Sequence, residues 1–249
     1  MRPNISLGDS LAGLHAAFGA ALALLARDGP RARAAGAAGA GAGQVVDAAI
    51  SESVFNMLEA AATEFGATGA VRGPSGATIT GVVPSGTWRA ACGAYVVIGG
   101  NGNSIYDRLM TAIGRPDMGL ENERYATDSA RVAHESEIVE AIAAWVAARP
   151  ADAAVAAMDA ARVPAGRILS ISDIAADAQY AARGMLERVA APGGGEAHLL
   201  PALLPVLAGT PGATRWAGPE LGAHTEEVLC GELGMSSEEL AELRAAGAV

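Results

Sequence analysis

Cysteine is scarce in this sequence, which contains Cys92 and Cys230 and no other cysteine. Two lone cysteines in 249 residues are no disulfide framework, so we expect a reducing, cytoplasmic environment. They also exclude a cysteine-rich zinc site, and the histidines are scattered without the spacing of metal ligands. We therefore expect no bound metal. The histidines are His15, His134, His198 and His224.

Positive charge is also scarce. The chain has 17 basic residues, all of them arginine, against 27 acidic residues, and its formal net charge is −10. Proteins that bind nucleic acid need clustered cations to contact phosphates. The nearest to a cluster here is Arg27, Arg31 and Arg33, in an Ala-Gly-rich stretch that is typical of a loop. We expect no nucleic-acid partner.

Aromatic residues make up 4% of the chain, although apolar residues make up 51%. Alanine, glycine, valine and leucine supply most of that apolar fraction, which favours close packing of helices. A chain of this length buries a sizeable core, either as one large domain or as two smaller ones.

The longest apolar run, residues 11–26, is shorter than the roughly 20 residues that a membrane-spanning helix requires. It resembles the core of a signal peptide. However, Arg2 is the one positive residue before it, Asp9 lies just ahead of the run, and His15 interrupts it. We predict a deeply packed helix of a soluble protein with a hydrogen-bonded core histidine and no membrane partner. A cleaved secretion signal is the alternative.

The N-terminal part of the chain predicts a helix that is capped by Asp9 or Ser10 and ends near Arg27. Gly100-Asn101-Gly102 lacks the third glycine of a dinucleotide-binding fingerprint, so we expect a plain strand-to-helix turn there. The other expected strands are at 44–50 and 185–189, and residues 88–98 predict two short strands around Gly93. The other expected helices are at 51–65, 104–113, 129–148, 151–161 and 173–183, followed by two C-terminal helices, the second with a capping box of Ser236 and Glu239. We expect a low-complexity loop at 31–43 and an irregular segment at 199–211.

Several segments, taken together and in this order, resemble the class III coenzyme A transferases, the group that contains formyl-CoA:oxalate and carnitine CoA-transferases. They are residues 2–13 (RPNISLGDSLAG), 43–47 (GQVVD) with the helix that follows, 95–98 (YVVI) with 114–116 (GRP), 163–166 (VPAG) with 184–186 (GML), and 218–229 (GPELGAHTEEVL). The resemblance covers almost the whole chain. It implies an α/β fold with a partial Rossmann-like large domain, a small α/β domain and an interlocked homodimer.

The resemblance also implies a domain order. Residues 1–65 correspond to the nucleophile-bearing part of the large domain, 66–86 to a glycine-rich linker or active-site loop, 87–166 to the small domain, and 167–249 to a C-terminal return to the large domain. In the family a long segment precedes the motif that contains Asp9. Three explanations stay open for its absence: a truncated gene model, a split enzyme with a separate N-terminal subunit, or an inactive remnant.

The resemblance implies that Asp9 is the catalytic nucleophile. A carboxylate can attack an acyl-CoA thioester and carry CoA as an aspartyl-CoA thioester, which splits one difficult exchange into easier steps. The implied activity transfers CoA from an acyl-CoA to a small carboxylic or dicarboxylic acid, with CoA thioesters as substrates and no permanently bound cofactor. The residue pattern alone favours the other interpretation of Asp9, a helix N-cap worth about 1 kcal/mol, and the resemblance reverses that preference.

The glycine-rich segment 66–86 contains Gly73, Gly76 and Gly81 and coincides with a loop that closes over the intermediate in the family. It lacks the consecutive glycines of the formyl-CoA transferase type, which argues against formate and oxalate as substrates. An interdomain linker is the alternative. Arg72 and Arg89 flank the segment, and either is a candidate to pair with the far carboxylate of a diacid. The alternative is that both are solvated surface residues.

Overall fold

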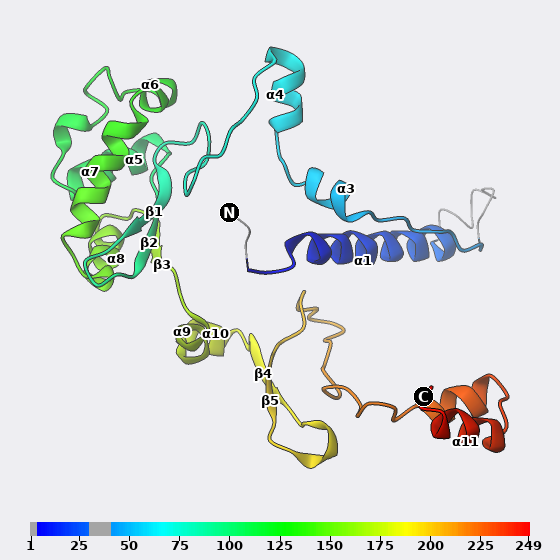
Figure 1. Cartoon of the computed structure of the whole chain (residues 1–249). Coiled ribbons are helices and arrows are strands. Elements are labelled where there is room, and N and C mark those ends of the chain that lie inside the picture. The colour runs from blue at the N-terminus through cyan, green and yellow to red at the C-terminus, as the bar shows by residue number, and fades with distance from the viewer. Residues whose placement is uncertain (1–3, 30–40) are drawn as a thin grey trace. The chain divides into compact units, whose positions relative to one another are not determined.

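The computed structural model describes residues 4–29 and 41–249, and its ribbon is drawn in Figure 1. Internal contacts divide the chain into two compact units, Met1–Val82 and Val83–Val249. The division falls inside the predicted glycine-rich segment 66–86. Most of the loop predicted at 31–43 lies outside the described residues. Helices and small antiparallel sheets are both present, which confirms a mixed α/β chain.

In the described residues 4–29 and 41–82, the first unit has the helices α1 (Leu7–Asp28), α3 (Ile50–Phe55) and α4 (Ala61–Thr68). The prediction of the first helix is confirmed. The prediction of a strand at 44–50 is wrong, because 42–49 is extended chain without a partner strand in the described residues. The helix predicted at 51–65 is broken in two around Glu59, whose φ of 51° is outside the helical region.

The burial predicted for the first helix is also wrong. None of the residues of α1 is buried, and Leu14, Phe18 and Leu25 are each more than 60% exposed. The reason is that α3 and the chain before it cover one side of α1 and leave the rest uncovered by the described part of the unit. With 22 residues and a mean hydropathy of 1.4, α1 has the length and composition of a membrane-spanning helix. The helices Glu135–Ala147 and Ala151–Ala160 pass the same test only together, as one span bent by 119°.

The second unit begins with a three-stranded antiparallel sheet in the order β1 (Ser85–Arg89), β2 (Tyr95–Gly99) and β3 (Ala165–Arg167). The first two strands form the predicted hairpin, and Gly93 provides the positive φ of 84° that its turn requires. Along β2, Val96 and Ile98 are fully buried, whereas Tyr95 and Val97 are exposed. This alternation gives the sheet one covered face and one open face.

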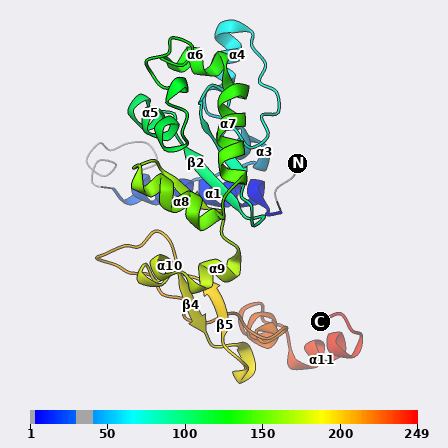
Figure 2. The ribbon, with the colours of Figure 1, turned by 90° about the vertical axis from the view of Figure 1, so that its left-hand side faces the viewer.

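Helices cover the buried face of this sheet. They are α5 (Asn103–Ala112), α6 (Asp128–Ala133), α7 (Glu135–Ala147) and α8 (Ala151–Ala160), with a short 3₁₀ turn, η1 (Pro116–Met118). Helix α7 packs on β1 and α8 on β2 and β3, and Figure 2 shows α7 and α8 beside β2. The fully buried residues of this core are aliphatic, methionine and tyrosine side chains: Val96, Ile98, Tyr106, Leu109, Met110, Ile138, Ile142, Val146, Ala154 and Met158.

One charged side chain, Arg131, is fully buried at the edge of this core. Its guanidinium donates to the carbonyl oxygens of Tyr125 at 3.1 Å and Asn101 at 3.2 Å, and to Asn103 Oδ1 at 2.8 Å. It also pairs with Asp128. The guanidinium donates to the Asn101 carbonyl and so stabilises the strand-to-helix turn at 100–102. The turn therefore has a structural role, as predicted.

The remaining elements of the second unit are short. Two helices, α9 (Ile171–Ala176) and α10 (Ala178–Ala182), precede a hairpin of β4 (Leu186–Val189) and β5 (His198–Pro201), with a 3₁₀ turn η2 (Pro192–Gly194) between the strands. A π-helical turn η3 (Glu227–Glu232) and the helix α11 (Ser237–Ala245) follow. The helix predicted at 173–183 is thus two short helices, which meet at Asp177. The return of residues 167–249 to the large domain stays a prediction.

The capping box predicted for the last helix is confirmed. Ser236 Oγ accepts from the Glu239 N–H at 3.1 Å, and Glu239 Oε2 accepts from the Ser236 N–H at 2.9 Å. We expect Ser236→Ala to destabilise α11 by about 1 kcal/mol, which corresponds to roughly fivefold faster exchange of its amide hydrogens. The matched control is Ser237→Ala, one position inside the helix, where no capping bond is lost. Equal exchange in both variants would contradict the role of the cap.

Candidate functional site

Asp9 lies in the first turn of α1. The N-cap is Ser6, so Asp9 is the third helical residue, and the predicted capping role of Asp9 or Ser10 is wrong. Its side chain is exposed and has no hydrogen bond or ion pair with any residue in the described part of the chain. The N–H groups of a first helical turn have no acceptor within the helix, and they lie at the positive end of its dipole. The carboxylate is thus free to react, beside donors suited to an anion.

The backbone beside Asp9 is in close contact with α3. A Cβ atom added to Gly8 would lie 2.8 Å from Ile50 Cγ2 and 3.5 Å from a Val54 methyl group. Farther along α1, a Cβ on Gly19 would lie 2.7 Å from Val46 Cγ1. Both glycines therefore permit the chain at 46–54 to approach the helix more closely than any side chain would allow.

His15 is located between these two glycines on the same side of α1. Its Nδ1 is 2.8 Å from the Leu11 carbonyl oxygen, and its Nε2 is 3.1 Å from Asn56 Nδ2. The predicted hydrogen bonding of this histidine is confirmed, but the ring is half-buried and is not in a core. It lines a concavity of about 400 Å³ in the first unit together with Asp47, Glu52 and Asn56.

Sequence reasoning did not find this contact between His15 and Asn56. A signal was nevertheless present, because Gly8, His15 and Gly19 are separated by seven and four residues. Such spacing places all three on one face of a helix. Two glycines and a histidine in that pattern on an otherwise apolar helix indicate where another segment approaches the backbone.

Residues 69–82 of the glycine-rich segment are a mostly exposed coil at the end of the first unit, whereas 66–68 belong to α4 and 85–86 to β1. Gly76 and Gly81 have φ values of 67° and 80°, which other residues rarely adopt. On either side of Gly76, Ser75 Oγ donates to the Thr78 carbonyl at 2.8 Å and Thr78 Oγ1 donates to the Ser75 carbonyl at 2.9 Å. Gly73 is exposed and has open space around its Cα. The geometry is that of a turn-rich loop, and a role in closing over an intermediate stays a prediction.

The two candidate arginines lie in different units and in different surroundings. Arg72 donates from Nε to Glu64 Oε2, so its charge is already paired. Arg89 is exposed on the open face of the small sheet, opposite Tyr95. No ion pair or side-chain hydrogen bond of Arg89 is present within residues 4–29 and 41–249. Of the two, Arg89 is the cation that is available to a ligand.

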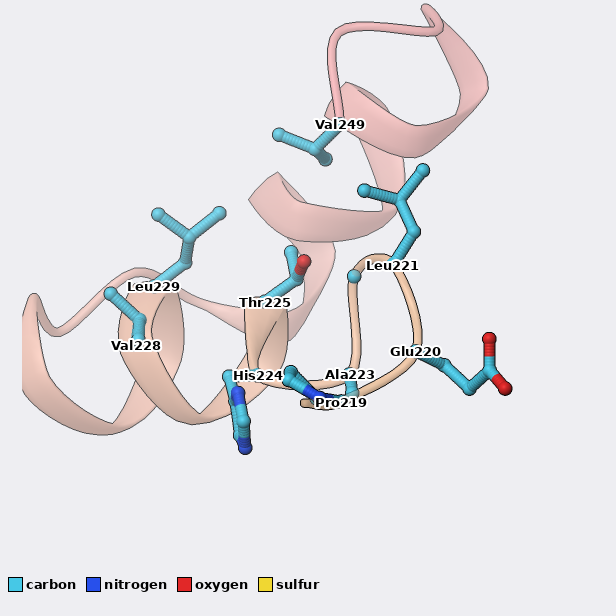
Figure 3. A pocket seen from close by; sticks show the side chains of 10 residues that line it. Pro219, Glu220, Leu221, Ala223, His224, Thr225, Val228, Leu229 and Val249 are labelled. Atoms are coloured by element: carbon cyan, nitrogen blue, oxygen red, sulfur yellow. The ribbon is translucent and has the colours of Figure 1, made fainter. Parts of the chain in front are cut away.

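A second concavity, of about 510 Å³, lies near the C-terminus and is shown in Figure 3. Leu221, Leu229 and Val249 contribute apolar side chains to it, and the His224 side chain is turned away from Val249. The His224 carbonyl accepts from the Val228 N–H at 2.9 Å, as a residue at the start of a helix does. Among the described residues, no group of three or more His, Cys, Asp or Glu side chains has the arrangement to hold a metal ion.

Comparisons with known proteins place this geometry in context. The family model described as CoA-transferase family III matches residues 1–225. The chain is 37% identical over 98% of its length to the succinyl-CoA–D-citramalate CoA-transferase of Chloroflexus aurantiacus, and covers 58% of that protein. It is 32% identical over 97% of its length to the beta subunit of a succinyl-CoA–L-malate CoA-transferase from the same organism, and covers 57% of it.

Solved structures give the same picture for the fold. A CAIB/BAIF family protein from Brucella suis matches 93% of this chain with a TM-score of 0.69 and 24% identity, and this chain covers 56% of it. The Rv3272 protein of Mycobacterium tuberculosis matches 90% with a TM-score of 0.68 and 20% identity, again over 56% of that protein. In each comparison the chain spans a little over half the length of its relative.

Proposed function

This chain belongs to CoA-transferase family III, and from that premise we propose that it supplies Asp9 as the nucleophile of a CoA-transferase. The observation that carries the proposal is the family match over residues 1–225, which includes the Leu7-Gly8-Asp9-Ser10 motif. The exposed, unpaired carboxylate of Asp9 supports it. Because the chain spans 58% of its citramalate relative, the activity is proposed for the assembled enzyme.

The proposed reaction needs no group beyond the carboxylate and the two substrates. Asp9 attacks the thioester carbonyl carbon of the donor, the C–S bond breaks, and a mixed anhydride and CoA thiolate result. The thiolate attacks the aspartyl carbonyl carbon, which releases the donor acid and leaves an aspartyl-CoA thioester. The carboxylate of the acceptor acid then repeats both steps in reverse, so acceptor-CoA leaves and Asp9 is regenerated.

Each attack on a carbonyl carbon in this cycle creates an oxyanion. The free N–H groups of the first turn of α1 are suited to stabilise it, because they combine hydrogen-bond donors with the positive end of the helix dipole. This arrangement supports a mechanism in which backbone N–H groups stabilise the oxyanions formed around one carboxylate, without a general base.

We propose a small dicarboxylic acid as the acceptor. The two relatives above are named for succinyl-CoA with citramalate or malate, which supports a four- or five-carbon diacid framework for both substrates. A diacid presents a second carboxylate that does not react. The unpaired Arg89 guanidinium is the better candidate to bind it, because Arg72 is already engaged by Glu64.

For the assembled enzyme we expect Arg89→Ala to raise the apparent KM for a diacid about tenfold, as the loss of one charge-assisted hydrogen bond implies. The apparent KM for a monoacid of equal length should change less than twofold. Arg72→Ala is the matched control and should affect both acceptors little, because its charge is paired with Glu64. Steady-state kinetics with both acceptors checks this. Equal effects of Arg89→Ala on the two acceptors would rule out the role.

The proposed intermediate is tested by trapping. We expect incubation of the assembled enzyme with acyl-CoA, followed by borohydride or hydroxylamine, to modify Asp9. Peptide mass spectrometry should find the modification in the tryptic peptide that contains Asp9 and in no peptide containing Asp28. If the label appears elsewhere, or if none forms while turnover proceeds, the aspartyl-CoA pathway is refuted.

A second candidate function is a non-catalytic or split-subunit part of such an enzyme. The exposed apolar residues of α1 favour association with further protein, since large exposed apolar patches mark interaction surfaces. We propose that the rest of a Rossmann-like large domain packs on these apolar residues in the cytoplasm. It is supplied by a separate N-terminal subunit or within a homodimer. Relatives named as alpha and beta subunits support a multi-chain assembly. Calorimetry with CoA distinguishes a catalytic chain from a non-catalytic one. If the isolated chain binds CoA with micromolar affinity, the hypothesis that it is a non-catalytic part of the enzyme is refuted.

A further inference from the structure

Helix α3 contacts α1 at both ends of α3. At the first end, Ile50 contacts the backbone at Gly8, the residue directly before Asp9. At the second end, Asn56 is the C-cap of α3, and its side chain bonds to His15. The single buried residue of α3, Ser53, lies between the two points and is 4% exposed. Helix α3 therefore braces the turn of α1 that carries Asp9.

The hydrogen bonds of His15 determine its tautomer. The Leu11 carbonyl oxygen can only accept, so Nδ1 must carry the proton that lies toward it. Nε2 of the neutral ring then accepts from the amide group of Asn56. Both ring nitrogens are used, so the ring is fixed in orientation and has no free lone pair with which to act as a base.

Two acidic side chains lie near His15 but do not bond to its ring. The side chains of Asp47 and Glu52 line the same concavity, but neither has a hydrogen bond or ion pair to the imidazole within the described ranges. Among the described residues, the hydrogen bond from the His15 side chain to another helix is thus the one with Asn56.

We propose that His15 and Asn56 are positioning residues for Asp9, an inference that rests on the proposed function. Their hydrogen bond holds the second end of α3 and so keeps the first end seated at Gly8. Without it, the first turn of α1 gains freedom at the residue beside the nucleophile. Because a displacement of about 1 Å in a reacting group costs up to about 100-fold in rate, partial loosening should cost about tenfold.

The test is a double-substitution cycle in the assembled enzyme. His15→Leu and Asn56→Leu are each expected to lower kcat about tenfold, with the KM for acyl-CoA changed less than twofold. The double variant should be no slower than the slower single variant, because both remove the same bond. His15→Gln should keep most of the rate, since its amide oxygen can still accept from Asn56. The same amount of Asp9 should become labelled in every variant, but more slowly.

Asn56→Ala is a milder change that gives the same information if a leucine variant does not fold. Losses that multiply to about 100-fold in the double variant, or a kcat equal to that of the unsubstituted enzyme in the single variants, would overturn the inference. Asp9→Ala is measured in parallel. If Asp9→Ala is inactive and the His15 and Asn56 variants are unaffected, the positioning role alone fails. If Asp9→Ala is active, the proposed function fails as well.

Discussion

Replacing Asp9 with alanine is expected to lower kcat for CoA transfer by at least about 1,000-fold in the assembled enzyme. Under the proposed function, the substitution removes the carboxyl group that carries CoA between the two acids, and loss of a nucleophile is among the most costly changes an enzyme can undergo. Stability should change little, because an acidic residue in a first helical turn is worth about 0.3–1 kcal/mol. A direct assay of acyl-CoA exchange, with thermal melting of both proteins, checks the prediction.

Asp28→Ala is the matched control for this substitution. Asp28 is an exposed carboxylate at the opposite end of the same helix, paired with Arg27. Its loss should change kcat less than twofold, since an exposed ion pair contributes little. If Asp9→Ala and Asp28→Ala keep equal activity, the carboxylate at position 9 is not the nucleophile.

Replacing Arg131 with methionine is expected to lower the free energy of unfolding of the second unit by about 2–4 kcal/mol. Methionine is similar in length, but it leaves the buried carbonyl of Tyr125 and the partly buried carbonyl of Asn101 without their donor. It also removes the cation that lies 4.7 Å from the ring centre of Tyr106. Burial raises the pKa of the Tyr106 hydroxyl, so the ring beside the guanidinium stays neutral. A urea titration of both proteins measures the difference.

Arg124→Met is the control for that experiment. Arg124 is on the same segment of chain, but its side chain is 55% exposed and its ion pair with Glu137 faces solvent. We expect a change of about 0–1 kcal/mol. Similar losses in the two variants would show that the buried network of Arg131 does not stabilise the unit beyond an ordinary surface arginine.

Features that depend on neighbouring residues were predictable from the sequence. The capping box of Ser236 and Glu239 and the hairpin turn at Gly93 are set by residues a few positions apart, and both predictions are confirmed. The strand expected at 44–50 failed because a strand needs a partner, and hydropathy does not show whether one is present. Arg131 was not recognised as buried, because an arginine among acidic residues ordinarily indicates an exposed helix face.

The candidate site was predictable only in part. An aspartate in a first helical turn has the same local pattern as a helix cap, so periodicity could not distinguish a nucleophile from a cap at Asp9. The resemblance to a family made that distinction. The environment of Arg72 and Arg89 required coordinates, because the partner of Arg72, Glu64, is eight residues away on another element.

The division of the chain at Val82 and Val83 separates its chromophores completely. All tryptophans and tyrosines lie after this division, and phenylalanine is the only one of the three aromatic residue types in the sequence of the first unit. Absorption at 280 nm and intrinsic fluorescence therefore originate entirely in the second unit. The first unit, which includes the helix that carries Asp9, has no tryptophan or tyrosine to report a change in its structure. Far-ultraviolet circular dichroism detects the helices of both units, including the 22 residues of α1. A loss of helix signal without a change in fluorescence is therefore assigned to the first unit.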